Sequence, residues 1–510
     1  MTSYLKLLNS KQQIGVFGGL LLFFILILFG DLEPGKPEVT YTLAVALLMA
    51  VWWITEAIPL AVTSLLPVVL FPLLGVMNGK DVSSTYFNHV IFLFIGGFIV
   101  AIAMQKWNLH KRIALKILMY TGVSPARILL GFMLATAFLS MWISNTATTM
   151  MMVPILLSII QKLEESIGKK AIGKYATGLF LGVAYSASIG GIATLVGTPP
   201  NLSFARIFQI MFPEAPEISF ANWIAFALPV TIILFIFVWL YLFMIYRPKT
   251  KSWVKISKNE FKTQYKELGS IGWEEKIILI DFILLAVLWL SRSNITIGNF
   301  TLPGWSNIFS SPSFINDGTV AIAMAVLLFL IPSRKKDREK LMTWKAATGI
   351  PWHIVLLFGG GFALASAFKE SGLSLWFGEE LSWVVNIHPF LIILVICLVM
   401  TFLTELTSNT ATTEMLLPVL AGLAVTTQIN PLLLMLPATL SASMAFMLPV
   451  ATPPNAIIFG TGKINMIDMA RTGLILNIFG AIIITIITYF LGEAVFGIEI
   501  GIFPDWANVN

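Results

Sequence analysis

The hexapeptide SNTATT decides how this chain folds, because it stands twice in apolar surroundings. It occurs at 144–149 within FLSMWISNTATTMMMVP (138–154) and at 408–413 within FLTELTSNTATTEMLLP (402–418). Ser, Asn and Thr are preferred N-cap residues, because their side chains accept hydrogen bonds from the first free backbone N–H groups of a helix. Each copy therefore predicts a break inside an apolar segment and the start of a new helix.

The composition is that of an integral membrane protein. Of the 510 residues, 57% are hydrophobic and 11% are charged, and the mean hydropathy is +0.87. Soluble domains contain about 25% charged residues. Apolar runs close to the ~20 residues of a spanning helix recur at 14–30, 41–55, 89–104, 220–246, 319–332 and 472–492. We predict an all-α polytopic membrane protein, in which the single cysteine excludes a disulfide framework and a cysteine-based metal site.

Positive charge predicts the topology, because cytoplasmic loops of membrane proteins collect Lys and Arg. The same effect accounts for the net charge of +6 better than nucleic-acid binding does. With a cytoplasmic N-terminus, an external C-terminus and about 11 transmembrane helices, 27 of the 32 Lys and Arg residues are cytoplasmic, including eight in 247–276. No small-residue cleavage site follows the first apolar run, so we interpret that run as a retained helix in the inner (cytoplasmic) membrane.

The segment 128–161 is too short for two full membrane spans. Both of its flanks are basic and therefore cytoplasmic, so it must cross an even number of times. It has only 34 residues, whereas two spans need about 40. We predict a re-entrant hairpin with SNT at its tip, since non-helical backbone at membrane depth is tolerated where protein or a water-filled cavity surrounds it. A second hairpin, at about 388–428, is predicted to enter from outside.

The duplication extends beyond the hexapeptide. FLFIGG (92–97) corresponds to LLFGGG (356–361) at a separation of 264 residues, the same separation as between the two hexapeptides. YSASIGGIATLVGTPPN (185–201) corresponds to LSASMAFMLPVATPPN (440–455). Because the two tips are approached from opposite sides, we predict two inverted repeats. This pattern is typical of secondary transporters, whose substrate site lies at the membrane midplane between interrupted helices.

The two motifs supply complementary chemistry. A helix that starts at SNT leaves backbone N–H groups and a positive dipole end free, so two opposed tips suit the two ends of a small dianion. The two prolines of GTPPN (197–201) and of ATPPN (451–455) remove backbone donors and predict an unwound helix there. The freed carbonyl oxygens are suitable ligands for a sodium ion. No Lys or Arg falls inside either repeat core, so dipoles, amides, hydroxyls and co-bound cations must hold the anion.

Each motif alone has a simpler explanation, since small polar residues also pack helices together and prolines also make plain kinks. The occurrence of both motifs in the same order in both halves favours binding. Other ionisable residues in or beside apolar segments are functional candidates of lower weight. We interpret Glu56 as structural and Asp281 as hydrated. Glu405 is a candidate for a tuning or proton-linked role, and Glu414 is a further candidate.

The paired SNT and TPP motifs resemble the divalent anion/sodium symporter family, the di- and tricarboxylate carriers of the wider ion-transporter superfamily. Segment 442–458 also resembles that family's signature, with Phe446, Pro449 and Asn455 in place and Ile458 where the signature has valine. The resemblance covers nearly the whole chain. It implies a homodimer in the lipid bilayer, in which a transport domain moves against a scaffold domain as an elevator and carries sodium with its substrate.

The resemblance also implies the site residues. The substrate contacts carried over by motif are Ser144, Asn145, Thr146, Thr198, Ser408, Asn409, Thr410 and Thr452. One sodium site would use Ser140, Ser144, Asn145 and the Gly197 backbone. Its counterpart in the second repeat would use Thr404, Thr407, Asn409 and the Ala451 backbone.

Five segments follow from these predictions. They are the N-terminal scaffold helices 1–126, the first transport core 127–246, the cytoplasmic basic loop 247–276, the second scaffold segment 277–387 and the second transport core 388–510.

We predict sodium-coupled symport of a C4-dicarboxylate of the succinate, malate and fumarate class. The alternatives are a sodium-independent dicarboxylate exchanger of the same fold, citrate or sulfate as the substrate, and a channel with inverted re-entrant loops. A membrane-embedded enzyme would need an activated nucleophile or a metal cluster, and the sequence offers neither, so we predict no enzymatic activity and no catalytic residue.

Overall fold

The computed structural model describes residues 10–168, 172–248, 259–297, 300–335 and 339–508. The N-terminal residues 1–9 and residues 249–258 of the basic loop lie outside this part, so the cytoplasmic placement of both stays a prediction. The regular secondary structure of the described residues is almost entirely helical, as the sequence predicts, and one short β-hairpin departs from it. Among the residues that the structure describes, eight helices are able to cross a membrane by length and composition, and shorter apolar helices lie between them.

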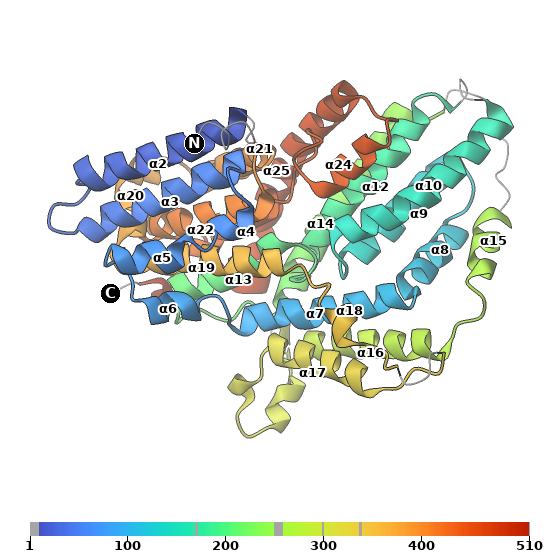
Figure 1. Ribbon diagram of the computed structural model, residues 1–510, viewed down its shortest axis with the longest axis horizontal. Helices are drawn as coiled ribbons and strands as arrows, with labels where there is room; N and C mark the ends of the chain where they lie inside the picture. The colour runs from blue at the N-terminus through green and yellow to red at the C-terminus, as the bar shows by residue number, and fades with distance from the viewer. Residues whose placement is uncertain (1–9, 169–171, 249–258, 298–299, 336–338, 509–510) are drawn as a thin grey trace, which may run out of the picture.

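The helices of the first half run from the N-terminus to the basic loop (Figure 1). In chain order they are α2 (Ser10–Phe29), α3 (Pro37–Thr55), α4 (Leu60–Thr63), α5 (Leu66–Leu73), α6 (Gly79–Ser84), α7 (His89–Lys106), α8 (Leu109–Thr121), α9 (Pro125–Ser140), α10 (Asn145–Ile167), α12 (Tyr175–Ile192), α13 (Pro199–Met211) and α14 (Phe220–Tyr246).

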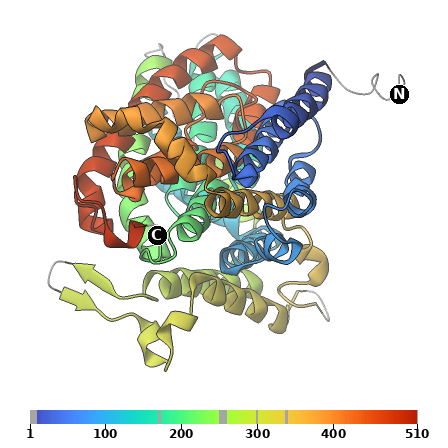
Figure 2. The same ribbon diagram turned by 90° about the vertical axis from the view of Figure 1, so that its left-hand side faces the viewer.

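The second half repeats much of this order. Its helices are α15 (Asn259–Glu267), α16 (Trp273–Leu290), α17 (Asp317–Leu330), α18 (Trp344–Ala347), α19 (Trp352–Ser371), α20 (Leu373–Glu380), α21 (Pro389–Thr404), α22 (Asn409–Thr426), α23 (Pro431–Ser441), α24 (Pro453–Gly460) and α25 (Met466–Phe496). Four 3₁₀ turns are η1 (Trp305–Ile308), η2 (Pro312–Phe314), η3 (Ser382–Asn386) and η4 (Asp505–Ala507). Strands β1 (Ile295–Ile297) and β2 (Phe300–Leu302) pair antiparallel and project from the helical body (Figure 2).

The breaks at SNT fall where the sequence predicts them. α9 and α21 end just before the motif, and α10 and α22 begin at its asparagine. The first helix pair is longer than predicted, however, because α10 has 23 residues and continues to Ile167. The first pair runs from Pro125 to Ile167 and is therefore longer than the segment 128–161 that the sequence predicts to form the hairpin.

The breaks near TPP lie earlier than predicted. α12 ends at Ile192 and α13 begins at Pro199, while α23 ends at Ser441 and α24 begins at Pro453. The prolines take the first positions of the new helix, where a missing N–H costs nothing. The unwound residues therefore precede TPP instead of lying within it.

Helices of the two halves pack in matching pairs. α9 lies on α12 as α21 lies on α23, and α14 lies on α12 as α25 lies on α23. The helix after each SNT also contacts the helix after the other half's TPP, since α10 packs on α24 and α22 on α13. Near the middle of the molecule Phe94 and Phe358, which correspond in FLFIGG and LLFGGG, meet edge to face with their ring centroids 5.2 Å apart.

Burial separates the central helices from the peripheral ones. Every residue of α12 is buried within the protein, whereas only 17% of the apolar window of α2 is buried. An apolar face without protein cover suits contact with lipid. α12, which carries Ala187 and leads into the first TPP break, is therefore enclosed by protein on all sides.

Candidate site at the interrupted helices

The first break brings two of the predicted residues together. Ser144 takes the N-cap position of α10, and its Oγ accepts a hydrogen bond from the Ala147 N–H at 3.3 Å. Ser140 Oγ lies 2.5 Å from Asn145 Oδ1 and 2.7 Å from the carbonyl oxygen of Ala187 in α12. The side chains of Ser140 and Asn145 therefore meet across the break and are tied to the neighbouring helix.

The second break has the same arrangement. Thr404 Oγ1 lies 2.7 Å from Asn409 Oδ1 and 2.9 Å from the carbonyl oxygen of Ala442. Ala187 and Ala442 are the central residues of two Ser-Ala-Ser tripeptides at corresponding places in the two halves. Ser408 takes the N-cap position of α22, but its side chain makes no capping hydrogen bond. A hydroxyl, an amide oxygen and a backbone carbonyl thus converge in both halves.

The unwound segment before TPP adds a free carbonyl to the first group. A β-carbon placed on Gly191 would lie 2.7 Å from Asn145 Oδ1 and 3.2 Å from the Gly197 carbonyl oxygen, so both oxygens face the space beside this glycine. Within the described ranges, no hydrogen bond is donated to the carbonyl oxygen of Gly197 or of Ala451. These neutral oxygens have the chemistry that a sodium ion requires at an unwound transporter helix.

Thr407 is the predicted sodium ligand that stands apart from this pattern. Its hydroxyl donates to the Leu403 carbonyl at 3.0 Å and is hydrogen-bonded to Thr412. In the described part of the chain, no hydrogen bond joins Thr407 to Thr404 or Asn409. The first half has Ile143 at the corresponding position, so the two halves differ here.

Exposure divides the predicted substrate contacts into two groups. Most residues at the two SNT breaks are half-buried: Ser144, Asn145, Thr146, Ser408 and Asn409. Three threonines are buried, with exposed fractions between 3% and 6%: Thr198, Thr410 and Thr452.

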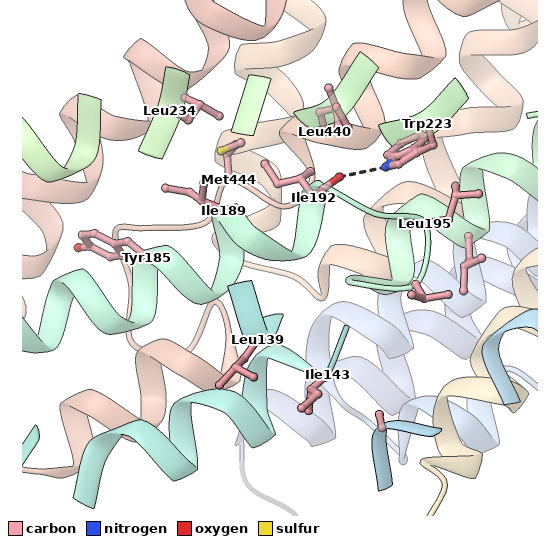
Figure 3. Packing of buried hydrophobic residues seen from close by; sticks show 14 of the residues in the cluster. Leu139, Ile143, Tyr185, Ile189, Ile192, Leu195, Trp223, Leu234, Leu440 and Met444 are labelled. Carbon is pink, nitrogen blue, oxygen red and sulfur yellow. Dashed lines mark hydrogen bonds between the residues drawn. The ribbon is translucent and has the colours of Figure 1, made fainter. Parts of the chain in front are cut away.

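Apolar side chains fill the space around the first break (Figure 3). Leu139 lies near the end of α9, Ile143 lies in the break itself, and Ile189 lies on the neighbouring α12. Trp223 Nε1 donates to the Ile192 carbonyl at 3.0 Å, and this bond satisfies the last residue of α12 (Figure 3). The polar groups of the break are thus held in an apolar, close-packed setting, where electrostatic interactions are strong.

Glu405 binds the unwound backbone of the second half. Its Oε1 accepts hydrogen bonds from the N–H groups of Phe446 at 2.7 Å and Met447 at 2.8 Å, and Oε2 accepts one from Leu448 at 2.9 Å. Asn477 Nδ2 donates to Oε1 at 2.7 Å. The side chain is buried, with 3% of it exposed. In this structure the carboxylate therefore acts as a clamp on residues 446–448.

The other acidic candidates differ in outcome. Glu56 is the C-cap of α3 in a left-handed conformation, with φ of 49°, which agrees with the structural interpretation. The interpretation of Asp281 as hydrated is wrong, because its side chain is only 5% exposed and lies on the buried face of α16 with Ile278 and Leu285. Glu414 is fully buried, and its Oε1 accepts a hydrogen bond from Ser203 Oγ at 3.0 Å.

The space beside Gly191 gives the first prediction. We expect Gly191→Ala to lower the apparent sodium affinity by about 10- to 100-fold, the range for disturbed metal surroundings, because the new methyl group would lie 2.7 Å from Asn145 Oδ1. The measurement is uptake against sodium concentration. Gly460→Ala in α24 is the control, since no atom lies within 4 Å of its added β-carbon. Unchanged sodium dependence in Gly191→Ala would show that this space is not used.

Comparison with known proteins gives consistent relatives. A family model, the sodium:sulfate symporter transmembrane region, matches residues 19–498. The sodium-dependent dicarboxylate transporter SdcS of Staphylococcus saprophyticus is 44% identical over 500 residues, which cover 97% of this chain and 94% of that protein. SdcS of Staphylococcus aureus strain bovine RF122 is also 44% identical, over 501 residues with the same coverage.

Two solved structures share the fold at low sequence identity. MtrF of Neisseria gonorrhoeae has a TM-score of 0.54 and 13% identity, with 92% of this chain and 96% of that chain covered. The YdaH transporter of Alcanivorax borkumensis has a TM-score of 0.56 and 12% identity, with 96% and 100% covered. The family match and the SdcS relatives extend over nearly the whole sequence, so this chain belongs to the sodium:sulfate symporter family, the divalent anion/sodium symporters, whose members are membrane transporters and not enzymes.

Proposed function

We propose that this protein is a sodium-coupled symporter that imports a C4-dicarboxylate of the succinate, malate and fumarate class. Relatives that are 44% identical over 97% of the chain are named sodium-dependent dicarboxylate transporters. One observation carries the proposal. The contacts of Ser140 with Asn145 and of Thr404 with Asn409 are built alike in the two halves, and each half offers a carbonyl without a hydrogen bond, at Gly197 and Ala451.

Sodium binds first in this mechanism. In the first half, Ser140, Ser144, Asn145 and the Gly197 carbonyl hold one ion; in the second, Thr404, Thr407, Asn409 and the Ala451 carbonyl hold another. No fixed positive side chain lies among these residues, and an uncompensated carboxylate at membrane depth is costly. The bound ions supply the missing charge and draw each SNT break toward its unwound segment, which orients the donors for the anion.

The anion then binds between the two SNT breaks. Its carboxylates accept hydrogen bonds from free N–H groups at the starts of α10 and α22 and from the side chains of both motifs, namely Ser144, Asn145, Thr146, Thr198, Ser408, Asn409, Thr410 and Thr452. Two opposed sets of neutral donors suit a molecule with an anionic group at each end. Because binding is linked, sodium strengthens anion binding by the same factor as the anion strengthens sodium binding.

We further propose an elevator in a homodimer of the cytoplasmic membrane. The helix pairs at SNT are re-entrant hairpins of two inverted repeats, and the matching packing of the halves supports this arrangement. Residues 127–246 and 388–510 form the transport domain and move against a scaffold of 1–126 and 277–387. The hydrogen bond from Lys369 Nζ to the Ile210 carbonyl, 2.8 Å long, joins the two and must break in that movement.

Substrate affinity across a sodium series tests the coupling. The purified protein is titrated with succinate by calorimetry, with choline replacing sodium so that ionic strength stays constant. We expect affinity to rise with sodium. A flat response, together with uptake into liposomes that needs internal dicarboxylate and ignores a sodium gradient, would establish the exchanger instead. A rate that does not saturate would indicate a channel.

A competition panel identifies the anion. The description of the family model names sulfate, whereas the names of the SdcS relatives give dicarboxylates. We expect unlabelled malate and fumarate to compete with labelled succinate for uptake, and sulfate and citrate to compete poorly. Strong competition by sulfate alone would reject the dicarboxylate.

The threonines before the prolines give a second prediction. We expect Thr198→Ala and Thr452→Ala to raise the succinate KM more than they change sodium affinity, because each loses one hydroxyl donor, a hydrogen bond of about 0.5–1.5 kcal/mol. Thr452 Oγ1 also accepts a hydrogen bond from the Asn455 N–H at 3.4 Å, whereas Thr198 makes no capping bond. Thr198→Ala is therefore the cleaner test, and an effect on sodium alone would place Thr198 among the cation ligands.

A further inference from the structure

The asparagine that ends each TPPN motif holds the unwound segment in front of it. Asn201, in the first turn of α13, donates from Nδ2 to the Thr194 carbonyl at 2.7 Å and to the Gly191 carbonyl at 3.2 Å. A longer contact reaches the Ile192 carbonyl at 3.4 Å. These bonds satisfy carbonyl groups that the end of α12 leaves without helical partners.

Asn455 makes the corresponding bonds in the second half. Its Nδ2 donates to the carbonyl oxygens of Ala445 and Leu448, each at 3.0 Å. Asn201 reaches back ten and seven residues, to Gly191 and Thr194, and Asn455 reaches back by the same intervals. The amide group therefore contacts equivalent backbone positions in both halves.

Simple capping of a broken helix does not explain this agreement. The preceding helices end at different distances from the asparagine, because α12 ends at Ile192, nine residues before Asn201, and α23 ends at Ser441, fourteen residues before Asn455. A cap would follow the end of its helix. The bonds keep their spacing from TPPN instead, so they serve the segment next to the prolines.

That segment ends at the carbonyl that is assigned to the cation in the proposed mechanism. The Thr194 carbonyl, which Asn201 binds, also accepts the Gly197 N–H at 3.3 Å. The Leu448 carbonyl, bound by Asn455, accepts the Ala451 N–H at 3.2 Å. Each amide therefore fixes the base of a four-residue turn, whose last residue presents a carbonyl oxygen without a hydrogen bond.

The side chains are used as donors alone. Asn201 and Asn455 are fully buried, and within the described residues neither Oδ1 accepts a hydrogen bond. A buried acceptor without a partner is unfavourable. Because this cost occurs at the same position in both halves, we attribute the role of the amide to the two hydrogen bonds that its Nδ2 donates. Aspartate has the same shape but no donor, so it would place negative charge against carbonyl oxygens.

We propose that Asn201 and Asn455 are positioning residues of the two sodium sites, which aim the carbonyl groups of Gly197 and Ala451 without touching the ion. Gly191 links the first of them to the rest of its site, because its carbonyl binds Asn201 while its Cα faces Asn145. This inference rests on the sodium-coupled transport proposed above. Partners in the outer shell of a metal site typically change affinity by about 10- to 100-fold.

The experiment compares Asn201→Asp, Asn455→Asp and the double variant in the full chain in proteoliposomes. We expect each single variant to lower the apparent sodium affinity of succinate uptake by about 10- to 100-fold, while the succinate KM at saturating sodium changes far less. The double variant should lose more affinity than either single one. Sodium alone should also raise the thermal unfolding temperature less in the variants than in the parent protein, which a merely structural role would not produce.

Asn88→Asp is the matched control. Asn88 also stands at a helix start and donates from Nδ2 to a backbone carbonyl, that of Thr85, at 3.0 Å, but it lies outside the site. If the Asp variants do not fold, Asn201→Ser and Asn455→Ser replace them in the experiment. Each keeps one donor and should bind sodium more weakly than the parent protein. Folded variants with parental sodium affinity overturn the proposal. A parent protein whose uptake ignores sodium rejects the proposed function itself, which separates the two failures.

Discussion

We expect replacement of Asn145 or Asn409 by alanine to abolish sodium-driven uptake while the protein still folds. The expected loss is at least about 100-fold, because in the proposed mechanism each amide serves the ion and the anion together and lies in the ligand shell itself. Asn145 Oδ1 lies 2.5 Å from Ser140 Oγ, and Asn409 Oδ1 lies 2.7 Å from Thr404 Oγ1, so either change removes the centre of one oxygen cluster. Uptake of labelled succinate into liposomes under a sodium gradient measures the effect.

Asn316→Ala is the control for this experiment. Asn316 also takes an N-cap position, where its Oδ1 accepts the Thr319 N–H at 3.0 Å, but it starts α17 away from both breaks. It should retain uptake and lose only some helix stability. Near-normal sodium-driven uptake in Asn145→Ala or in Asn409→Ala would remove the assignment of the site.

Replacement of Glu405 by alanine should unfold the second break. Three backbone N–H groups of residues 446–448 and the Asn477 amide donate to this carboxylate. A buried donor left without a partner costs about 1–3 kcal/mol, so that the variant should be destabilised by at least ~3 kcal/mol. We expect a lower thermal unfolding temperature in detergent and no transport. Glu405→Gln keeps one acceptor oxygen, so its thermal unfolding temperature should lie between those of Glu405→Ala and the parent protein.

Met141 supplies the control for Glu405, because it stands at the corresponding place in the first half. Its side chain offers no carboxylate, and Thr194 Oγ1 donates to its backbone carbonyl at 2.5 Å instead. Met141→Ala should therefore leave that backbone bond in place and have a smaller effect. Parental stability of Glu405→Ala would show that the unwound backbone finds other acceptors, and the clamp would then have no role in stability.

The breaks at SNT could be located from sequence because their chemistry is local. Ser144 caps the helix that begins at Asn145, and its partner, the Ala147 N–H, lies within the same hexapeptide. The exact positions of the TPP breaks could not be predicted in the same way, because a proline can follow the end of one helix or take the first position of the next. Pro199 and Pro453 each begin a helix, so the unwound residues lie on the N-terminal side of the prolines.

Contacts between distant segments were beyond sequence reasoning. Glu405 stood out as a carboxylate near SNT, but its partners begin 41 residues later, and nothing local indicates them. The burial of Asp281 likewise depends on which face of α16 meets the protein. Asn201 and Asn455 could have been found, since the TPPN duplication displays both and a buried amide at an unwound turn has few other uses.

Neither half of this chain is complete on its own. The helix after each SNT covers the helix after the other half's TPP, so a half expressed alone would leave α10 without α24, or α22 without α13. With the inverted repeats proposed above, two copies of one half inserted in opposite orientations would restore both contacts. In that arrangement a gene for a single half would have to encode a dual-topology dimer, whereas the two halves of this chain differ at matching positions, as at Glu405 and Met141.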